Sequence, residues 1–521
     1  MTASTLNRRA ALLTLGAGLA APALVRAQGF RTDPFSLGVA SGDPAPDGFV
    51  IWTRLAPEPL EPTGGMAMRP VRVEWEVGTD ETLRTVVRKG EATARPELAH
   101  AVHVEVAGLE PNRPYWYRFN VGPERSQIGR AVTAPPPGAP LDRLRFAVAG
   151  CQAYTDGLYT AFGHLAREPE LAFVFHYGDY IYEGREQATR WDWTTRSVRP
   201  VVRRHLGQEC FSLDDYRRRY ALYKADADLR NAHAAAPFVV SWDDHEIDNN
   251  WADDLDQDGT PPEVFAFRRA AAMQAWYEHM PVRVAQRPRG GDLQLFRRLA
   301  WGDLLTAHVL DTRQHRTDQP CGDGVKPGCA AQDAPAATLT GQAQERWLLE
   351  GLSNRTRWNL LAQQVMMMPL DRRTDPAAPE PVWNLDSWSG YRAQRRRLLD
   401  AIVERRLRNV VVATGDEHQH YAGEVRTRGA EGELAAVEFV STSISSGGDG
   451  VNIRPGWDRV LAANPFLKLV NDQRGYTVHQ VGRDAWTTEV KVVDRVSAPG
   501  GALSTRARFA VAPDGRGLQA A

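Results

Sequence analysis

The chain has 521 residues, of which 43% are hydrophobic and 24% are charged, as is usual for a soluble globular protein. This length is enough for two or three domains with full-sized cores, and the composition excludes a disordered, collagen-like or membrane-embedded chain. The 63 basic and 64 acidic residues leave a net charge of −1, so composition gives no reason to expect a nucleic acid or an anionic membrane as partner.

The N-terminal segment, residues 1–27, has the features of an export signal. Arg8 and Arg9 precede an apolar stretch that runs to about Leu24, and small residues for cleavage follow up to Ala27. The arginine pair resembles a twin-arginine (Tat) signal; a Sec signal that carries two arginines is the alternative. No later segment reaches transmembrane length. We therefore expect a periplasmic or secreted protein that uses the Tat export machinery.

Residues 30–134 read as a small β-sandwich. Short stretches between turns alternate polar and apolar residues, as half-buried strands do. The predicted strands are Phe49 to Trp52, Val71 to Val77, His103 to Val106 and Tyr115 to Val121. Glu110-Pro111 followed by Tyr115 resembles the tyrosine corner of fibronectin-like sandwiches. A proline-rich linker at residues 135–141 ends this domain.

Residues 142–495 alternate strands with helices, which predicts an α/β domain whose strands are buried on both faces. The predicted strands are Leu144 to Ala149, Phe173 to Tyr177, Phe238 to Ser241, Leu305 to Leu310 and Val410 to Thr414. The predicted helices include Tyr159 to Arg167, Val264 to His279 and Arg392 to Arg408. Residues 496–521 are rich in glycine and proline and are expected to form a loose C-terminal tail.

Polar residues gather where four of these strands end. The four runs are Gly150-Cys151-Gln152, Gly178 to Glu183, Trp242 to Glu246 with Asn249-Asn250 behind it, and Gly415 to His420. Functional groups in α/β folds collect past the carboxyl ends of strands, so we expect one metal site. A thiolate with a phenolate suits iron, and carboxylate and amide oxygens suit calcium, magnesium or manganese. Two such ions would assist phosphoester hydrolysis.

These motifs resemble the signature of the PhoD-like alkaline phosphatases. The resemblance covers Phe35 to about Val492 and includes Phe35 to Pro44, Asp311-Thr312-Arg313-Gln314 and Arg474-Gly475-Tyr476. It implies an αββα metallophosphoesterase domain behind a fibronectin-like sandwich. It also implies iron(III) with calcium, Fe3+ and Ca2+, and phosphomonoester and phosphodiester substrates.

The resemblance assigns ligands to the iron side of the site. Cys151 lies at the position of the iron-binding thiolate, Asp179 at that of the bridging carboxylate and Tyr182 at that of the phenolate. The family usually has Ser before this Cys, whereas this chain has Gly150, which puts in doubt a hydrogen bond from that hydroxyl. Asp416 and His418 resemble the last metal-binding motif.

The remaining assignments concern the second metal and the substrate. Asp244 would bind the second metal, and His245 would bind phosphate or protonate the leaving oxygen. One of Asn249 and Asn250 should add an amide oxygen, and we prefer Asn249. Arg313, as a catalytic residue, and Arg474, as a substrate-binding residue, could each steady the phosphate with bidentate contacts.

The expected reaction is hydroxide attack in line with the leaving oxygen, without a covalent phosphoenzyme. Small phosphoesters, with phospholipids or nucleotides among them, are the expected substrates, and the expected state is a monomer. A phospholipase D-like phosphodiesterase of the same fold is the alternative, and an inactive phosphate-binding relative is a second. Export permits disulfides, and Cys321 and Cys329 flank a glycine-rich loop that they could close. The sequence does not choose among the pairings of its four cysteines.

Overall fold

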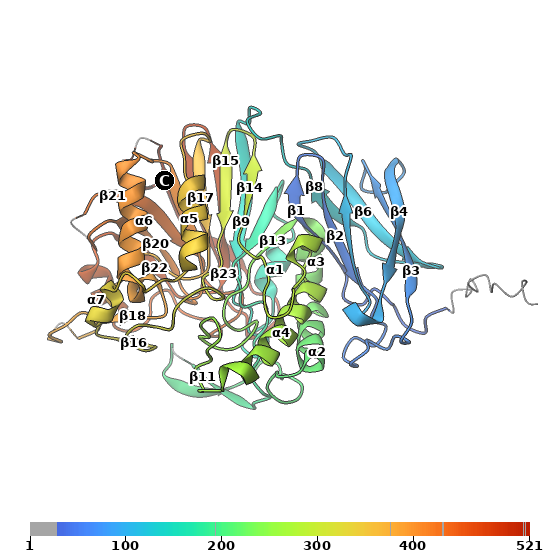
Figure 1. Cartoon of the computed structure of the whole chain (residues 1–521), viewed down its shortest axis with the longest axis horizontal. Helices are drawn as coiled ribbons and strands as arrows, with labels where there is room; N and C mark the ends of the chain where they lie inside the picture. Colours follow the sequence, from blue (N-terminus) through green and yellow to red (C-terminus); the bar gives the residue numbers. More distant parts are fainter. Residues whose placement is uncertain (1–28, 193, 376, 430–431, 514, 516) are drawn as a thin grey trace, which may run out of the picture.

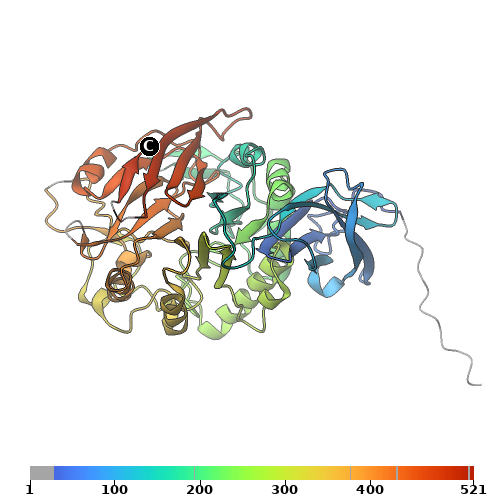
Figure 2. The same cartoon turned by 90° about the horizontal axis from the view of Figure 1, so that it is seen from above.

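The computed structural model describes residues 29–192, 194–375, 377–429, 432–513, 515 and 517–521 (Figure 1). The predicted signal segment lies outside the described residues. Two large sheets stand face to face in the middle of the molecule, with helices on both outer sides and the N-terminal strands at one end (Figures 1 and 2). The fold is therefore the expected αββα arrangement with an added N-terminal sandwich.

The larger sheet has ten strands and is mixed. In spatial order it contains β26 (Leu518–Ala520), β25 (Leu503–Val511), β24 (Trp486–Val493), β23 (Gly475–Gly482), β9 (Arg143–Ala149), β10 (Phe173–His176), β13 (Phe238–Val240), β1 (Val39–Ala45), β2 (Gly48–Arg54) and β5 (Ala101–Val106). β9, β10 and β13 pair in parallel, so their carboxyl ends lie at the same edge.

The second sheet has seven strands. Its order is β14 (Arg297–Trp301), β15 (Leu305–Val309), β17 (Trp358–Ala362), β19 (Val410–Thr414), β21 (Leu434–Val440), β20 (His420–Arg426) and β22 (Leu467–Asn471). β15, β17, β19 and β21 pair in parallel. Two small hairpins lie outside the sheets, β11 (Thr189–Asp192) with β12 (Ser197–Pro200) and β16 (Val325–Lys326) with β18 (Trp383–Asn384).

Three hydrophobic cores join the layers. The helices are α1 (Thr160–Leu165), α2 (Leu213–Lys224), α3 (Ala227–Ala235), α4 (Pro262–His279), α5 (Gly341–Gly351), α6 (Arg392–Glu404) and α7 (Trp457–Ala463). One core packs α1 to α4 on the ten-stranded sheet, one lies between the sheets, and one packs α5 to α7 on the seven-stranded sheet. In β9, Phe146 and Val148 enter the core between the sheets, whereas Ala147 enters the helix-side core. Strands buried on both faces explain the continuous apolar runs in the sequence.

The predicted strands and helices of the α/β region are confirmed, with ends that differ by a few residues. β10 ends at His176, one residue before the predicted end, and α6 ends at Glu404, four residues before it. Helix and strand ends are the least well determined part of any such pattern, because the terminal turn is stabilised by contacts from elsewhere. No helix of the described residues is long and apolar enough to cross a bilayer.

The N-terminal strands form the predicted sandwich. Its outer sheet contains β4 (Val86–Ala94), β3 (Val71–Gly78), β6 (Pro114–Val121), β7 (Glu124–Arg125) and β8 (Gly129–Val132). The hydroxyl of Tyr115 accepts from the Glu110 backbone N at 2.9 Å, as expected for a tyrosine corner. The opposite sheet is not separate, because β1 pairs with β13 and carries β2 and β5 into the ten-stranded sheet. The ten-stranded sheet thus includes strands from both sides of the proline-rich linker in the sequence.

The expectation of a loose C-terminal tail is wrong. β25 pairs along its length with β24, and β26 adds the edge strand of the ten-stranded sheet. The segment Leu503–Val511 alternates intermediate or buried with exposed positions over much of its length, as a strand with one covered face does. Its neighbouring glycines and prolines mark turns between strands. Cys321 and Cys329, a pairing that the sequence left open, form a disulfide, whereas Cys151 and Cys210 are free.

Candidate metal centre

The loops that follow β9, β10, β13 and β19 converge on one cluster of side chains. Three groups have all their ligand atoms within 4.8 Å of one another. The groups are Cys151, Asp179 and His418; Asp179, Asp244 and His245; and Asp243, Asp244 and Asp416. The first two share Asp179 and the last two share Asp244. The cluster is thus one continuous row of candidate metal ligands.

The first group has the softer ligands. Cys151 Sγ lies 3.3 Å from Asp179 Oδ2, and the Tyr182 hydroxyl donates to that same oxygen at 2.6 Å. His418 Nε2 lies 3.1 Å from the Tyr182 hydroxyl. The sequence-predicted residues Cys151, Asp179, Tyr182 and His418 are therefore brought together, although they come from three separate loops. A thiol, a phenol and an imidazole beside one carboxylate suit a transition metal.

The other end of the row is made of carboxylates. Asp243, Asp244 and Asp416 approach one another there, and hard cations prefer such oxygen ligands. Oδ1 of Asp179, Oδ2 of Asp243 and Oδ1 of Asp244 are buried and have no hydrogen-bond partner among the described residues. Buried carboxylate oxygens are costly unless they are paired or bind a metal. The donor set therefore fits cations.

The acid–base properties of the cluster point the same way. Burial raises the pKa of Asp179 to about 7 and that of Asp243 to about 8. Burial and the carboxylates of Asp179 and Asp416 raise the pKa of the Cys151 thiol well above its usual value. Bound cations would reverse these shifts, because they favour the anionic form of every ligand.

The backbone is held in an uncommon conformation at the ligands. Cys151, Asp179, Asp416 and His418 have φ values of 51°, 55°, 67° and 52°. Left-handed backbone costs free energy in residues other than glycine, and such costs concentrate at functional sites. Gly150, before the thiol, has a packing reason, since an added Cβ would lie 2.5 Å from the Tyr177 ring.

His245 lies beside the row of ligands. Its Nδ1 donates to Glu183 Oε2 at 2.7 Å, and its ring lies 4.1 Å from that of Tyr182, centroid to centroid. Burial alone would lower the pKa of His245, but the charges of Glu183, Asp244 and Asp179 raise it well above the usual value. The imidazolium is partly exposed, with 21% of its side chain accessible, so it can meet a substrate.

Arg313 has carboxylates as its partners within the protein. It is fully buried, and its guanidinium contacts Asp243 at 2.5 Å and Asp386 at 2.6 Å. Asp244 and Asp416 lie 3.7 and 3.8 Å away. The arginine therefore positions the carboxylates of the cluster, while its second terminal nitrogen has no hydrogen-bond partner among the described residues, and direct phosphate binding by Arg313 stays a prediction.

Arg474 is likewise committed to protein groups. It is fully buried, donates to Ser443 Oγ at 2.6 Å and to the His418 carbonyl at 2.9 Å, and pairs with Asp472 at 2.9 Å. These contacts hold the loop that carries His418. The structure thus shows Arg474 holding a loop beside the site, and its expected contact with substrate stays a prediction.

The two asparagines are not separated by the structure. The side-chain Nδ2 of Asn249 donates to Gln257 at 2.7 Å, and that of Asn250 donates to Asp323 at 2.6 Å. The backbone N of Asn250 donates to Asp244 Oδ2 at 2.8 Å. The preference for Asn249 as a ligand stays a prediction.

Sequence reasoning missed several members of the site. Asp243 belongs to the third ligand group. Its position in the run Trp242 to Glu246, just after β13, could have indicated this. Glu183 orients His245, and it closes the motif that begins at Gly178. Ser446 donates to the Tyr182 hydroxyl at 2.8 Å. No local sequence pattern predicts this contact, because the two residues are 264 positions apart.

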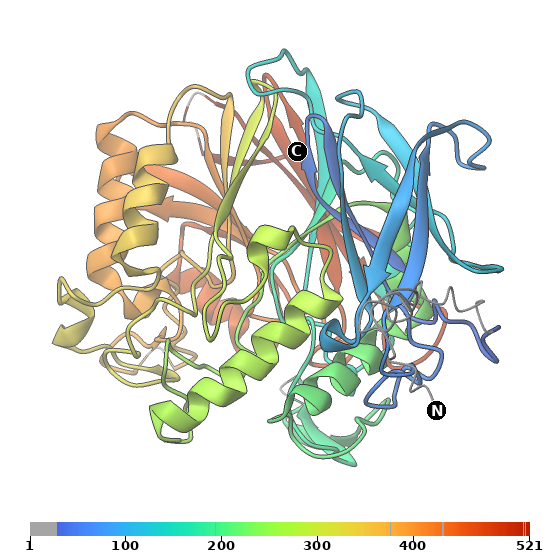
Figure 3. The same ribbon diagram turned by 45° about the vertical axis from the view of Figure 1, so that its right-hand side comes forward.

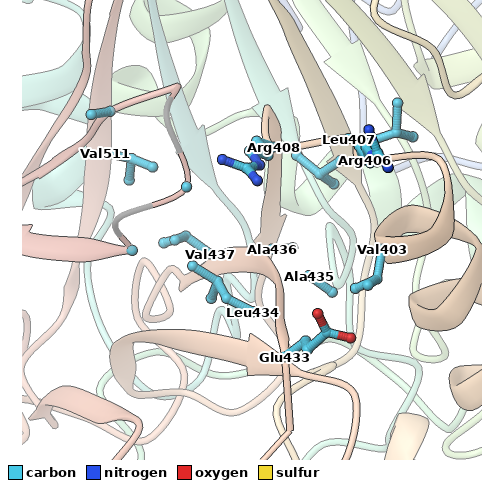
Figure 4. A pocket seen from close by; sticks show the side chains of 14 residues that line it. Val403, Arg406, Leu407, Arg408, Glu433, Leu434, Ala435, Ala436, Val437 and Val511 are labelled. Carbon is cyan, nitrogen blue, oxygen red and sulfur yellow. The ribbon is translucent and has the colours of Figure 1, made fainter.

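One surface pocket of the described chain shares no residue with the candidate metal centre. The pocket in Figure 4 has a volume of about 460 Å3 and lies between α6, β21 and the end of β25. Arg406, Arg408 and Glu433 line it together with apolar side chains. None of the predicted site residues lies there, so the pocket has no part in the chemistry described above.

Comparison with known proteins agrees with this geometry. The family model described as PhoD-like phosphatase matches residues 146–490, and that of the PhoD-like phosphatase N-terminal domain matches residues 19–135. The chain is similar to alkaline phosphatase D of Bacillus subtilis (strain 168), with 45% identity over 511 residues, 97% of this chain and 86% of the relative. It is also similar to the solved structure of PhoD, with a TM-score of 0.90 and 46% identity over 95% of this chain and 93% of the other. The chain belongs to the PhoD-like phosphatase family and is a hydrolase of phosphoesters.

Proposed function

We propose that this phosphatase is exported and hydrolyses both phosphomonoesters and phosphodiesters at a mixed centre of Fe3+ and Ca2+. The observation that carries the proposal is the row of three ligand groups that share Asp179 and Asp244. One end of the row is soft and phenolic, and the other contains only carboxylates. Two ions of different chemistry fit such a row better than two equal ones.

The residues divide between the two ions according to their donor atoms. Cys151, Tyr182 and His418 would hold iron, and Asp243, Asp244 and Asp416 would hold calcium. Asp179, whose Oδ2 faces the thiol and whose Oδ1 has no partner, would bridge them. When bound, such a pair of cations lowers the pKa of water and neutralises charge on the phosphoryl group.

The chain's own residues supply the proton transfer. His245 carries a proton held by the charge of Glu183, and Nδ1 is occupied by that contact. Nε2 is therefore the atom that donates the proton to the leaving oxygen. Glu183 is itself fixed, because its Oε1 accepts from the Asn249 backbone N at 3.0 Å. A neutral to alkaline pH optimum follows from activation of water.

The test is elemental analysis combined with assays of p-nitrophenyl phosphate and its bis ester. We expect iron and calcium in the purified protein, and loss of iron and of activity in Cys151→Ala. Cys210→Ala is the matched control, because Cys210 is also free and buried but belongs to none of the ligand groups. Full activity of Cys151→Ala, or of the chelated protein, would contradict the metal assignment.

Export is tested separately. The proposal rests on Arg8, Arg9 and the apolar stretch that follows them. Replacement of both arginines by lysine should retain the protein in the cytoplasm if the Tat route is used. Unchanged export of that variant would favour the Sec route.

The substrate preference is decided by the ratio of monoester to diester turnover in the assays with p-nitrophenyl phosphate and its bis ester.

A further inference from the structure

The segment between Gly184 and Phe211 carries exposed apolar side chains that the mechanism does not explain. Both ends of this segment, which we call the excursion, lie beside the candidate metal centre. Its ends are tied together, since the Glu186 backbone N donates to the Gly207 carbonyl at 3.0 Å. It contains the β11–β12 hairpin, which lies at the lower end of the molecule in Figures 1 and 3. The mechanism uses none of its residues.

The hairpin has two chemically different faces. The register pairs Arg190 with Arg199 and Trp191 with Val198. The arginine pair points inward and lies 3.4 and 3.8 Å from Asp156 Oδ1. Trp191 and Val198 point outward, with 47% and 64% of their surfaces exposed. The outer face thus presents an aromatic and an aliphatic side chain to the surroundings.

The rest of the excursion continues this pattern. Leu206 and Phe211 are also exposed, at 43% and 57%. Residues 184–211 contain six arginines and three acidic residues, so the segment is basic although the whole chain is neutral. Arg185, Arg196 and Arg204 are exposed on the same segment, and Arg204 lies 3.7 Å from Glu186. Exposed apolar side chains among arginines are the composition of surfaces that bind the interface of an anionic membrane.

The hairpin is firmly held. Asp156 anchors the inner arginines, and Thr194 Oγ1 donates to Asp472 at 2.7 Å. Asp156 Oδ2 in turn accepts from the Gly447 backbone N at 2.8 Å, next to Ser446, which contacts Tyr182. The inner side of the hairpin is therefore linked through Asp156 and the Ser446–Gly447 segment to the candidate metal centre.

We propose that the outer face of the β11–β12 hairpin, with Trp191 and Val198 at its centre and exposed arginines around it, docks this enzyme on an anionic lipid bilayer. The apolar pair enters the headgroup region, and the arginines contact lipid phosphates. The proposal concerns binding alone and does not depend on which phosphoester is cleaved.

The experiment is co-sedimentation with vesicles of phosphatidylcholine, pure or mixed equally with phosphatidylglycerol, without added metal ions. The full chain is used in every variant, so that binding by residues before Gly29 is common to all of them. We expect the protein to bind the anionic vesicles preferentially. Trp191→Ala combined with Val198→Ser should weaken binding at least tenfold, and Arg196→Gln with Arg204→Gln should remove the preference for phosphatidylglycerol.

The matched control is Val284→Ser. Val284 is an apolar side chain with comparable exposure, 54%, outside the hairpin. Its backbone N donates to Glu105 of the N-terminal strand β5. This variant should bind as the original protein does, and thermal unfolding should show that all variants fold. Absence of binding to anionic vesicles, or equal binding by the Trp191/Val198 double variant, would overturn the proposal, and the exposed face would then serve a protein partner.

Discussion

Replacement of Arg313 by glutamine tests whether this arginine holds the carboxylates of the candidate metal centre together. Its guanidinium is fully buried and lies between Asp243 and Asp386, with Asp244 and Asp416 just beyond contact distance. Glutamine keeps a polar side chain but removes the charge. Without bound metal, the variant leaves Asp243 and Asp416 without the guanidinium, whereas Asp386 keeps its ion pair with Arg316 at 2.8 Å.

The expected magnitude follows from these contacts. The attraction between opposite charges about 4 Å apart is about 4 kcal/mol at the effective dielectric constant of such sites. Part of this loss is recovered by proton uptake, because Asp243 already has a raised pKa of about 8. Loss of one partner of a buried ion pair costs about 3 to 5 kcal/mol, and we expect a value in that range for the metal-free protein.

The assay is urea denaturation with chelator and, separately, with iron and calcium. Bound cations replace the lost charge, so the destabilisation of Arg313→Gln should shrink to about half or less when metal is present. Arg54→Gln is the control, because Arg54 is equally buried but donates to the Ala99 carbonyl and the His279 ring. Its destabilisation should not respond to metal. A loss below about 1 kcal/mol in chelated Arg313→Gln, or a loss that metal leaves unchanged, would refute the positioning role.

Four further predictions follow from the same geometry. His245→Gln should lower kcat about 100- to 10,000-fold on alkyl phosphoesters and less on p-nitrophenyl phosphate, and equal losses on both would contradict proton donation by His245. Ser446→Ala removes the donor to the Tyr182 hydroxyl and should reduce metal affinity roughly 10- to 100-fold, measured by chelator competition; unchanged affinity would argue against it. In the chelated protein, folded Asp179 and Asp243 keep protons that aspartates of the unfolded chain release above about pH 4. The free energy of unfolding of the chelated protein should therefore fall between about pH 5 and 8.5. Asp243→Asn should flatten that slope. Tyr115→Phe should cost about 1 to 2 kcal/mol in urea denaturation, and an unshifted midpoint would show that the tyrosine corner is not stabilising.

The sequence predicted the core strands well because their signal is local. A strand buried on both faces is a short apolar run, and β9, β10, β13 and β19 each end in polar residues that no turn requires. The same holds for the tyrosine corner, whose partners are separated by 5 residues. Such features depend on neighbours along the chain, which periodicity and spacing reveal.

The roles of the arginines could not be predicted in this way. A motif shows that Arg313 lies near the site, but it does not show which groups surround its side chain. Its strongest partners come from residues 70 and 73 positions away, in other loops. Whether an arginine binds substrate or a carboxylate depends on those distant neighbours.

The sequence by itself determined the family resemblance, the alternation of strands and helices, and most of the residues in the candidate ligand groups, because each depends on short motifs. Only the tertiary structure showed that β1, β2 and β5 continue the main sheet, that β25 and β26 complete its edge, and that Asp243, Glu183 and Ser446 belong to the site. These are pairings between segments far apart in the chain. The unpaired backbone groups of a sheet edge and a buried charge both need partners, and many segments of the chain could supply them. The tertiary fold decides which segment lies close enough to do so.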